Sequence, residues 1–168
     1  MESKAKALGH PIHPMLIVFP LGLLATATIF DGIRGATGAE KWAEVGHYMQ
    51  GAGVVSGLVA AVPGAIDFLA IPDNTRAKRV GLVHGVGNVV ATGMFAASWL
   101  MRREDPGNPG AGAVKLSIAA TLLAVVTGWL GGELVDRLGV GVHDGANLNA
   151  PNSLTGRPAR QTEAGLAA

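Results

Sequence analysis

Four segments of this chain contain no Lys, Arg, Asp or Glu, and they limit its fold more than any other feature. They cover residues 9–30, 45–66, 80–101 and 116–132. An α-helix rises about 1.5 Å per residue, so each of the first three would reach about 33 Å and cross the ~30 Å hydrocarbon core of a bilayer. The fourth reaches only about 25 Å, but Lys115 before it can extend its ammonium group to the interface. The sequence therefore predicts four transmembrane helices.

Two other interpretations of these segments are less consistent with the sequence. A soluble bundle would need helices with a charged face opposite the apolar one, and these segments have no charged face. The first segment also imitates a signal peptide, because Lys4 and Lys6 precede an apolar run with small residues at 25–27. Pro20 within that run and Asp31 just after the segment argue against cleavage. We therefore expect the first segment to remain as a membrane helix.

The domain organisation follows from these segments. Residues 8–143 are expected to form an all-α, polytopic membrane four-helix bundle, followed by a disordered polar C-terminal tail over residues 144–168.

Lipid offers no hydrophobic drive for helix association, so stripes of small residues are expected to supply close packing. Gly57 and Gly128 belong to such stripes. Replacing either glycine by Leu is predicted to disrupt the bundle.

The distribution of positive charge predicts an orientation. Four helices place the N-terminus, the connection between the second and third segments and the C-terminus on one side, which we call the N-terminal face; the opposite side is the distal face. Eight of the 13 Lys and Arg residues lie on the N-terminal face. The positive-inside rule places that face in the cytoplasm. We expect a multi-pass protein of the cell (inner) membrane with both termini cytoplasmic.

Composition narrows the chemistry. The chain has no Cys, which excludes disulfides, cysteine nucleophiles and thiolate-bound iron–sulfur clusters. Its net charge is +1, and no basic stripe with interleaved aromatics indicates nucleic-acid binding. No nucleophile–base pair, phosphate loop or dinucleotide fingerprint is present, so the sequence assigns no enzymatic activity.

Polar and ionisable side chains converge on the N-terminal face. They are His10, His13, Asp67, His84, Asn88, Glu133 and His143. Ionisable residues near membrane depth are functional candidates by default. His84 and Asn88 are four residues apart and share one helix face. We predict that they form one polar cluster with at least one of His10 and His13, and that Asp67 or Glu133 accepts a hydrogen bond there.

His10 and His13 each precede a proline, which favours extended backbone over helix. In polyproline geometry their side chains would share a face about 9 Å apart, too far for one metal ion. One of them is therefore expected to face His84. Each of these residues also has a purely structural interpretation. The two histidines could form a rigid helix entry with their rings hydrogen-bonded to the backbone, and Asp67 could be the charge that ends the second helix. Glu133 could pair with Arg137 four residues further on.

Several motifs taken together resemble a known family. They are His10-Pro11-Ile12-His13-Pro14, Phe19-Pro20-Leu21-Gly22, Pro63-Gly64-Ala65-Ile66-Asp67, the pair His84 and Asn88, and Gly128-Trp129-Leu130-Gly131-Gly132-Glu133. The chain resembles, over about residues 8–143, a bacterial family of four-helix membrane proteins classed as domain of unknown function 2231. Asp136 and Leu138 stand where that family usually has Tyr and His. Some relatives resemble fusions to Rieske iron–sulfur domains, which implies electron transfer, but the family has no settled activity to carry over.

Three functions are open at this point. The most concrete is a haem-b or redox-associated membrane subunit, with His84, His13, His10 and Asn88 as the cofactor-binding residues and a redox partner or quinone. The second is a metal- or ion-handling protein that binds Zn or Fe through His84, His13, Asp67 and Glu133. The third is a non-catalytic structural subunit whose polar cluster only locks the bundle. In each case the lipid bilayer is the expected partner, and a homo-oligomer is left open.

Overall fold

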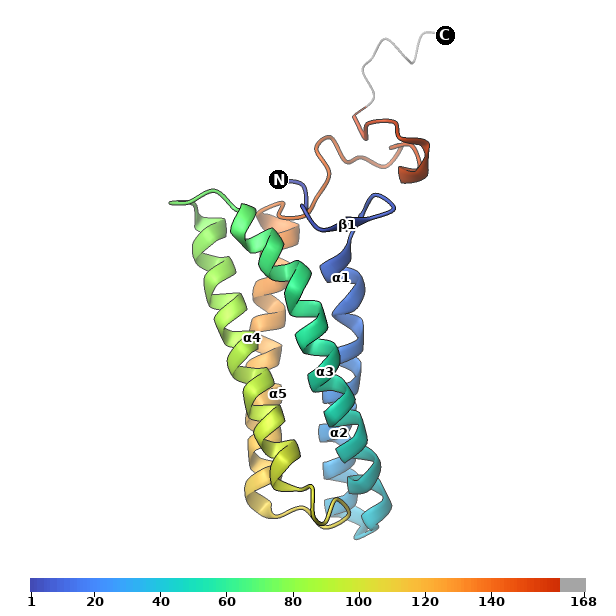
Figure 1. Cartoon of the computed structure of the whole chain (residues 1–168), viewed down its shortest axis with the longest axis vertical. Coiled ribbons are helices and arrows are strands. Elements are labelled where there is room, and N and C mark those ends of the chain that lie inside the picture. Colours follow the sequence, from blue (N-terminus) through green and yellow to red (C-terminus); the bar gives the residue numbers. More distant parts are fainter. Residues whose placement is uncertain (161–168) are drawn as a thin grey trace.

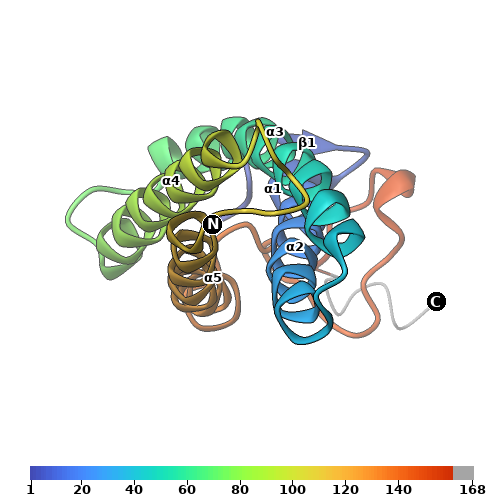
Figure 2. The ribbon, with the colours of Figure 1, turned by 90° about the horizontal axis from the view of Figure 1, so that it is seen from below.

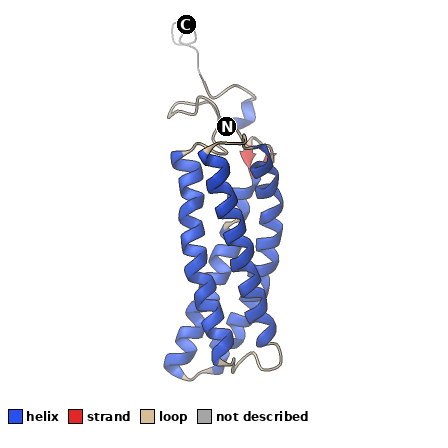
Figure 3. Ribbon diagram, turned by 90° about the vertical axis from the view of Figure 1, so that its left-hand side faces the viewer, coloured by secondary structure: helices blue, strands red, loops and turns tan. Residues whose placement is uncertain are grey.

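The computed structural model describes residues 1–160, and helices make up most of it (Figure 3). The main helices are α1 (Ile12–Leu16), α2 (Val18–Thr37), α3 (Glu40–Ala70), α4 (Arg76–Met101) and α5 (Ala111–Gly132). A π-helix, η1 (Glu133–Arg137), continues α5, and a short 3-10 helix, η2 (Ser153–Thr155), lies near the C-terminal end. Strands β1 (Lys6–Ala7) and β2 (His10–Pro11) form a small antiparallel hairpin before α1.

Four helical spans are long and apolar enough to cross a membrane. They are Ile12–Thr37, Glu40–Ala70, Arg76–Met101 and Ala111–Arg137. The predicted all-α, four-helix class is therefore confirmed. The spans run nearly parallel to the long axis of the molecule, and the connections after α2 and α4 lie at the end opposite the N-terminus (Figure 1).

The helices follow one another around the bundle. Helix α2 packs on α3, α3 on α4, α4 on α5, and α5 returns to α2 (Figure 2). Helices α1 and α2 therefore lie diagonally opposite α4, and α3 lies opposite α5. A side chain on α1 and one on α4 can meet only in the interior, between α3 and α5.

Side chains are distributed in the opposite way to a soluble protein. Large apolar residues face outward, and Val89 and Trp129 are 70% and 67% exposed. The interior combines a small apolar core with several buried polar side chains. The polar side chains at most 2% exposed are Gln50, Ser98, Arg102, Ser117 and Thr127. An apolar exterior with the polar groups held inside suits a bilayer, because lipid cannot satisfy hydrogen-bonding groups.

The helices extend beyond the charge-free segments. Helix α2 continues past Asp31 to Thr37, and the helix after α5 continues through Glu133 to Arg137. Asp31 can be buried inside a helix because it is paired there, as described below. Residues 144–160 include η2, whose Ser153 contacts His10, and residues 161–168 lie outside the described part of the chain. The disordered tail stays a prediction.

The predicted role of Gly128 is wrong. A Cβ added there would meet no atom of the described residues within 4 Å, so this glycine faces open space. At Gly57 the nearest atom, Cβ of Pro20, would be at an ordinary 3.7 Å. The close approach is at Gly53, where an added Cβ would lie 2.6 Å from a methyl carbon of Leu24 in the apolar core. Gly53 lies four residues before Gly57 in the same stripe, so the four-residue spacing does mark a packed position on α3, whereas it fails at Gly128.

Gly53→Ala should lower the free energy of unfolding in detergent by about 1–3 kcal/mol relative to Gly128→Ala, because an added methyl group overpacks the contact with Leu24. Both changes give the same gain in helix propensity, so Gly128→Ala is a matched control. The measurement is the midpoint of thermal unfolding. Equal midpoints for the two variants would show that α3 does not pack against α2 as described.

Candidate functional site

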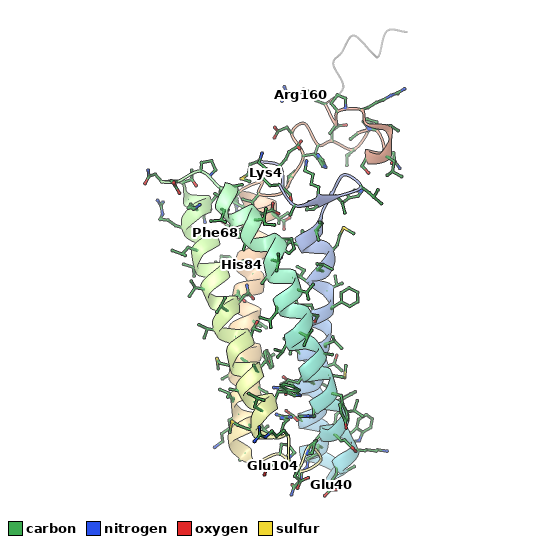
Figure 4. All side chains as sticks on the ribbon, in the orientation of Figure 1. Lys4, Glu40, Phe68, His84, Glu104 and Arg160 are labelled. Atoms are coloured by element: carbon green, nitrogen blue, oxygen red, sulfur yellow. The ribbon has the colours of Figure 1, made fainter. Side chains whose placement is uncertain are left out.

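His13 and His84 meet inside the bundle near the N-terminal face. His13 lies on α1 and His84 on α4, diagonally across the bundle, and their ring centres are 6.4 Å apart with perpendicular planes. His84 lies toward the end of the bundle that carries Lys4, whereas Glu40 and Glu104 mark the distal end (Figure 4). The prediction that His84 lies beside at least one of His10 and His13 is therefore confirmed.

Each of the two rings is fixed by a main-chain carbonyl of a neighbouring helix. Nδ1 of His13 lies 2.8 Å from the carbonyl oxygen of Ala60 on α3, and Nδ1 of His84 lies 2.8 Å from that of Thr127 on α5. A carbonyl oxygen only accepts, so Nδ1 must carry the proton in both rings. In a neutral imidazole this leaves Nε2 with an unprotonated lone pair. The arrangement therefore presents two imidazole nitrogens able to bind a metal or accept a proton.

Asn88 supports the His84 ring. Its side-chain nitrogen donates to the His84 carbonyl oxygen at 2.8 Å and makes longer contacts of 3.4 and 3.3 Å with the two ring nitrogens. Its side-chain oxygen accepts from the Thr127 hydroxyl at 3.0 Å. Asn88 thus joins the turn of α4 that carries His84 to the turn of α5 that holds its ring.

Glycines make room for the histidines. A Cβ added at Gly64 would lie 2.8 Å from Nδ1 of His13, and one at Gly131 would lie 3.1 Å from Cε1 of His84. Contacts under 3.0 Å do not occur for real Cβ atoms, so a side chain at position 64 would displace His13. These glycines belong to the two motifs quoted above, and their role is to admit imidazole rings between helices.

His13 corrects one expectation from the sequence. It was expected to be extended, because it precedes Pro14, but it is helical within α1, which begins after the N-cap residue Pro11. Pro14 is tolerated there because the first turn of a helix leaves its N–H groups without intrahelical acceptors. His10 lies in the hairpin instead, where its Nε2 is 3.2 Å from the Ser153 hydroxyl, so His10 is not part of the pair.

Asp67 binds the N-terminal segment rather than a histidine. Its carboxylate accepts from the Ser3 hydroxyl at 2.8 and 2.9 Å and from the main-chain N–H groups of Lys4 and Ala5 at 2.6 and 3.2 Å. Asp67 does more than end a helix: it fastens residues 3–5 over the N-terminal face. A carboxylate with this many donors is already satisfied.

The N-terminal segment is held by a second carboxylate. Glu2 bonds to Lys6, to His143 and to the main-chain N–H of Asp144. The hydrogen bond from Lys6, helped by those from Asp144 and His143, lowers the pKa of Glu2 to about 2. His143 therefore faces the N-terminal segment and not His84.

Glu133 is also engaged elsewhere. It pairs with Arg76 at 2.7 Å, so the predicted pair with Arg137 is wrong: beyond Gly132 the chain forms a π-helix, whose pitch differs from that of the α-helix. The four predicted metal ligands His84, His13, Asp67 and Glu133 are thus not assembled around one point. Within residues 1–160 no group of three or more His, Asp or Glu side chains could hold a metal ion.

A buried ion pair near the distal face was missed by sequence reasoning. Arg102 donates to both carboxylate oxygens of Asp31 at 2.8 and 3.0 Å, and also to the hydroxyls of Ser98 and Ser117 at 3.1 Å. Arg102 is 1% exposed and Asp31 6%. The sequence did contain a hint of this pair, because Asp31 and Arg102 directly follow apolar segments that both end at the distal face. Nearby, His47 stacks on Trp99 with ring centres 5.8 Å apart.

The fold, its lipid-suited exterior and the polar interior define the class of this molecule: it is a four-helix integral membrane protein. The family model described as "Predicted membrane protein (DUF2231)" matches residues 9–144, and the chain belongs to that family. The resemblance noted from the sequence motifs is therefore confirmed. Comparison with curated proteins and with solved structures gave no match.

Proposed function

We propose that this protein is a redox-associated membrane subunit that binds haem b, which His13 and His84 would hold through its iron. The observation that supports this most is the histidine pair itself: two imidazoles from diagonal helices, each with Nδ1 bonded to a carbonyl and Nε2 left to bind a metal. Cofactor sites in helical bundles are built in this way, from side chains on facing helices.

The separation of the rings suits one metal atom between them. Metal–nitrogen bonds of about 2.0–2.1 Å place two ligating nitrogens about 4 Å apart, and ring centres about 1 Å further back on each side are then about 6 Å apart. The observed distance between the ring centres is 6.4 Å.

The number of protein ligands favours haem over bare Zn or Fe. Zinc sites need three or four protein ligands, and Asp67 and Glu133 are bonded to other groups. Haem iron needs only axial ligands from the protein, and in a chain without Cys these are His or Met. When bound, the haem would supply one-electron chemistry.

The chain's own residues would tune such a centre. The carbonyl oxygens of Ala60 and Thr127 fix the tautomer and orientation of each ring and raise its basicity as a ligand. Asn88 holds the His84 backbone, and Asp67 fastens the N-terminal segment over the same face. A quinone or a redox partner would exchange electrons near this face, and the bias of Lys and Arg supports the proposal that the face is cytoplasmic in an inner membrane.

One observation favours a second candidate, a non-catalytic structural subunit. The same two hydrogen bonds tie α1 to α3 and α4 to α5, so they stabilise the bundle without any cofactor. A lock of this kind would use Nδ1 of both histidines as hydrogen-bond donors, and Nε2 of His84 would accept from the Asn88 amide nitrogen 3.3 Å away.

The absorption spectrum and metal content of the detergent-purified protein separate these functions. Haem binding predicts a Soret band and one iron per chain. One Zn or Fe per chain without a Soret band would select metal handling. Neither a chromophore nor a metal, even after reconstitution with haem, would contradict the proposal and leave the structural subunit.

A further inference from the structure

A second polar site lies at the distal face, away from the histidine pair. A cavity of about 430 Å³ opens between the C-terminal part of α2 and the start of α5. It is lined among others by Asp31, Arg34, Pro109, Ala111 and Lys115. The function proposed above uses none of these residues.

The cavity carries uncompensated positive charge. Asp31 is neutralised by its bidentate pair with Arg102. Arg34 and Lys115 form no ion pair with any carboxylate of residues 1–160, and the charge of Arg34 meets only the neutral side-chain oxygen of Asn108. Two cations without a counter-charge therefore face the same space.

Arg34 also has an unused donor. Its Nε is buried and finds no acceptor among the described residues. A buried N–H without an acceptor costs about 1–3 kcal/mol, more in a charged group, so the Arg34 side chain is not fully satisfied where it lies. The fork of an arginine guanidinium matches phosphate and carboxylate oxygens in particular.

The first turn of α5 adds to this. Its N-cap residue, Gly110, offers no side-chain cap, and Ala111 lines the cavity. The first N–H groups of a helix have no intrahelical acceptor, and together with the helix dipole they favour an anion. Arg34, Lys115 and the open helix start therefore surround one cavity with donors and positive charge.

We propose that this cavity binds a phosphate group. A cation is disfavoured, because Asp31, the one carboxylate that lines the cavity among residues 1–160, is already paired with Arg102. Phosphate reaches such a site as a phospholipid headgroup or as free phosphate. The cavity lies at the end of the membrane spans, where lipid phosphates are found, so the lipid headgroup is the occupant that its position favours.

The test uses the full chain in non-ionic detergent. Thermal unfolding and native mass spectrometry are recorded with added phosphatidylglycerol, phosphatidylcholine or inorganic phosphate. Wild type should retain phosphatidylglycerol in preference to phosphatidylcholine and unfold at a higher temperature with it. Lys115→Gln and Arg34→Gln should each weaken this binding about tenfold, the effect of losing one charge-assisted hydrogen bond.

Arg103→Gln is the matched control, since it removes a cation at the same face whose side chain is 70% exposed and does not line the cavity. It should bind phosphatidylglycerol as wild type does. Stabilisation by inorganic phosphate that depends on Lys115 and Arg34 would also support the site and identify free phosphate as its ligand. The proposal would be overturned if all three variants lost the same amount of phosphatidylglycerol binding. It would also be overturned if wild type bound neither phosphatidylglycerol nor inorganic phosphate.

Discussion

Arg102→Met is expected to lower the free energy of unfolding by about 3–5 kcal/mol, because removing one partner of a buried ion pair leaves the other charge buried without compensation. Asp31 would keep its place among helices α2, α4 and α5 but lose both hydrogen bonds from the guanidinium. The hydroxyls of Ser98 and Ser117, which also accept from Arg102, cannot replace a cation. The change should be seen in chemical or thermal unfolding in detergent.

Two further variants make this result specific. Arg103→Met removes the neighbouring, exposed arginine and should change stability by no more than about 0.5 kcal/mol. The double variant Asp31→Leu/Arg102→Met removes both charges and should recover much of the loss, since a buried pair replaced by apolar residues is often neutral. A single Arg102→Met variant as stable as wild type would show that Asp31 and Arg102 are not paired in the membrane.

His84→Ala and His13→Ala are each expected to reduce bound haem by more than tenfold after reconstitution, because each removes one of the two histidines proposed to bind its iron. His47→Ala is the matched control. His47 is also buried, but it lies near the start of α3, where it stacks on Trp99, and not beside His13 and His84. It should retain haem as wild type does. Haem content is measured from the Soret band and the iron-to-protein ratio.

Rescue of the spectrum by added imidazole distinguishes a metal-binding role of His84 from a purely structural one. In His84→Gly, added imidazole should restore the spectrum, because it can occupy the vacated space and bind the metal without being attached to α4. A residue that only locks α4 to α5 could not be replaced in this way. If His84→Ala and His47→Ala lose equal amounts of haem, the pair is not the binding site.

The sequence predicts the fold well for a simple physical reason. Lipid excludes charge over a fixed thickness, so the four charge-free segments directly mark the four spans. Because consecutive spans cross the membrane in alternating directions, the spans also determine which polar residues lie at the same membrane face. His84, Asn88 and at least one of His10 and His13 could therefore be placed together without knowledge of the packing, and the structure shows that the partner is His13.

What the sequence does not predict depends on the rotation of each helix. Ala120 and Gly128 belong to one stripe with the right spacing, but only Ala120 is buried in the core while Gly128 faces open space, so spacing alone does not say which positions meet a neighbour. The pairing of Asp31 with Arg102 joins residues 71 positions apart and needs the order of helices around the bundle. For Glu133, a local partner at Arg137 was expected, and the π-helix instead leaves the carboxylate to Arg76 on α4.

Pulsed electron paramagnetic resonance of the oxidised, haem-reconstituted protein tests the central claim most directly, because it counts the imidazole nitrogens bound to the metal. The pair described here predicts two imidazole ligands in wild type and one in His13→Ala and in His84→Ala. A single imidazole in wild type, or two in either variant, would contradict the assignment of His13 and His84 as the axial ligands.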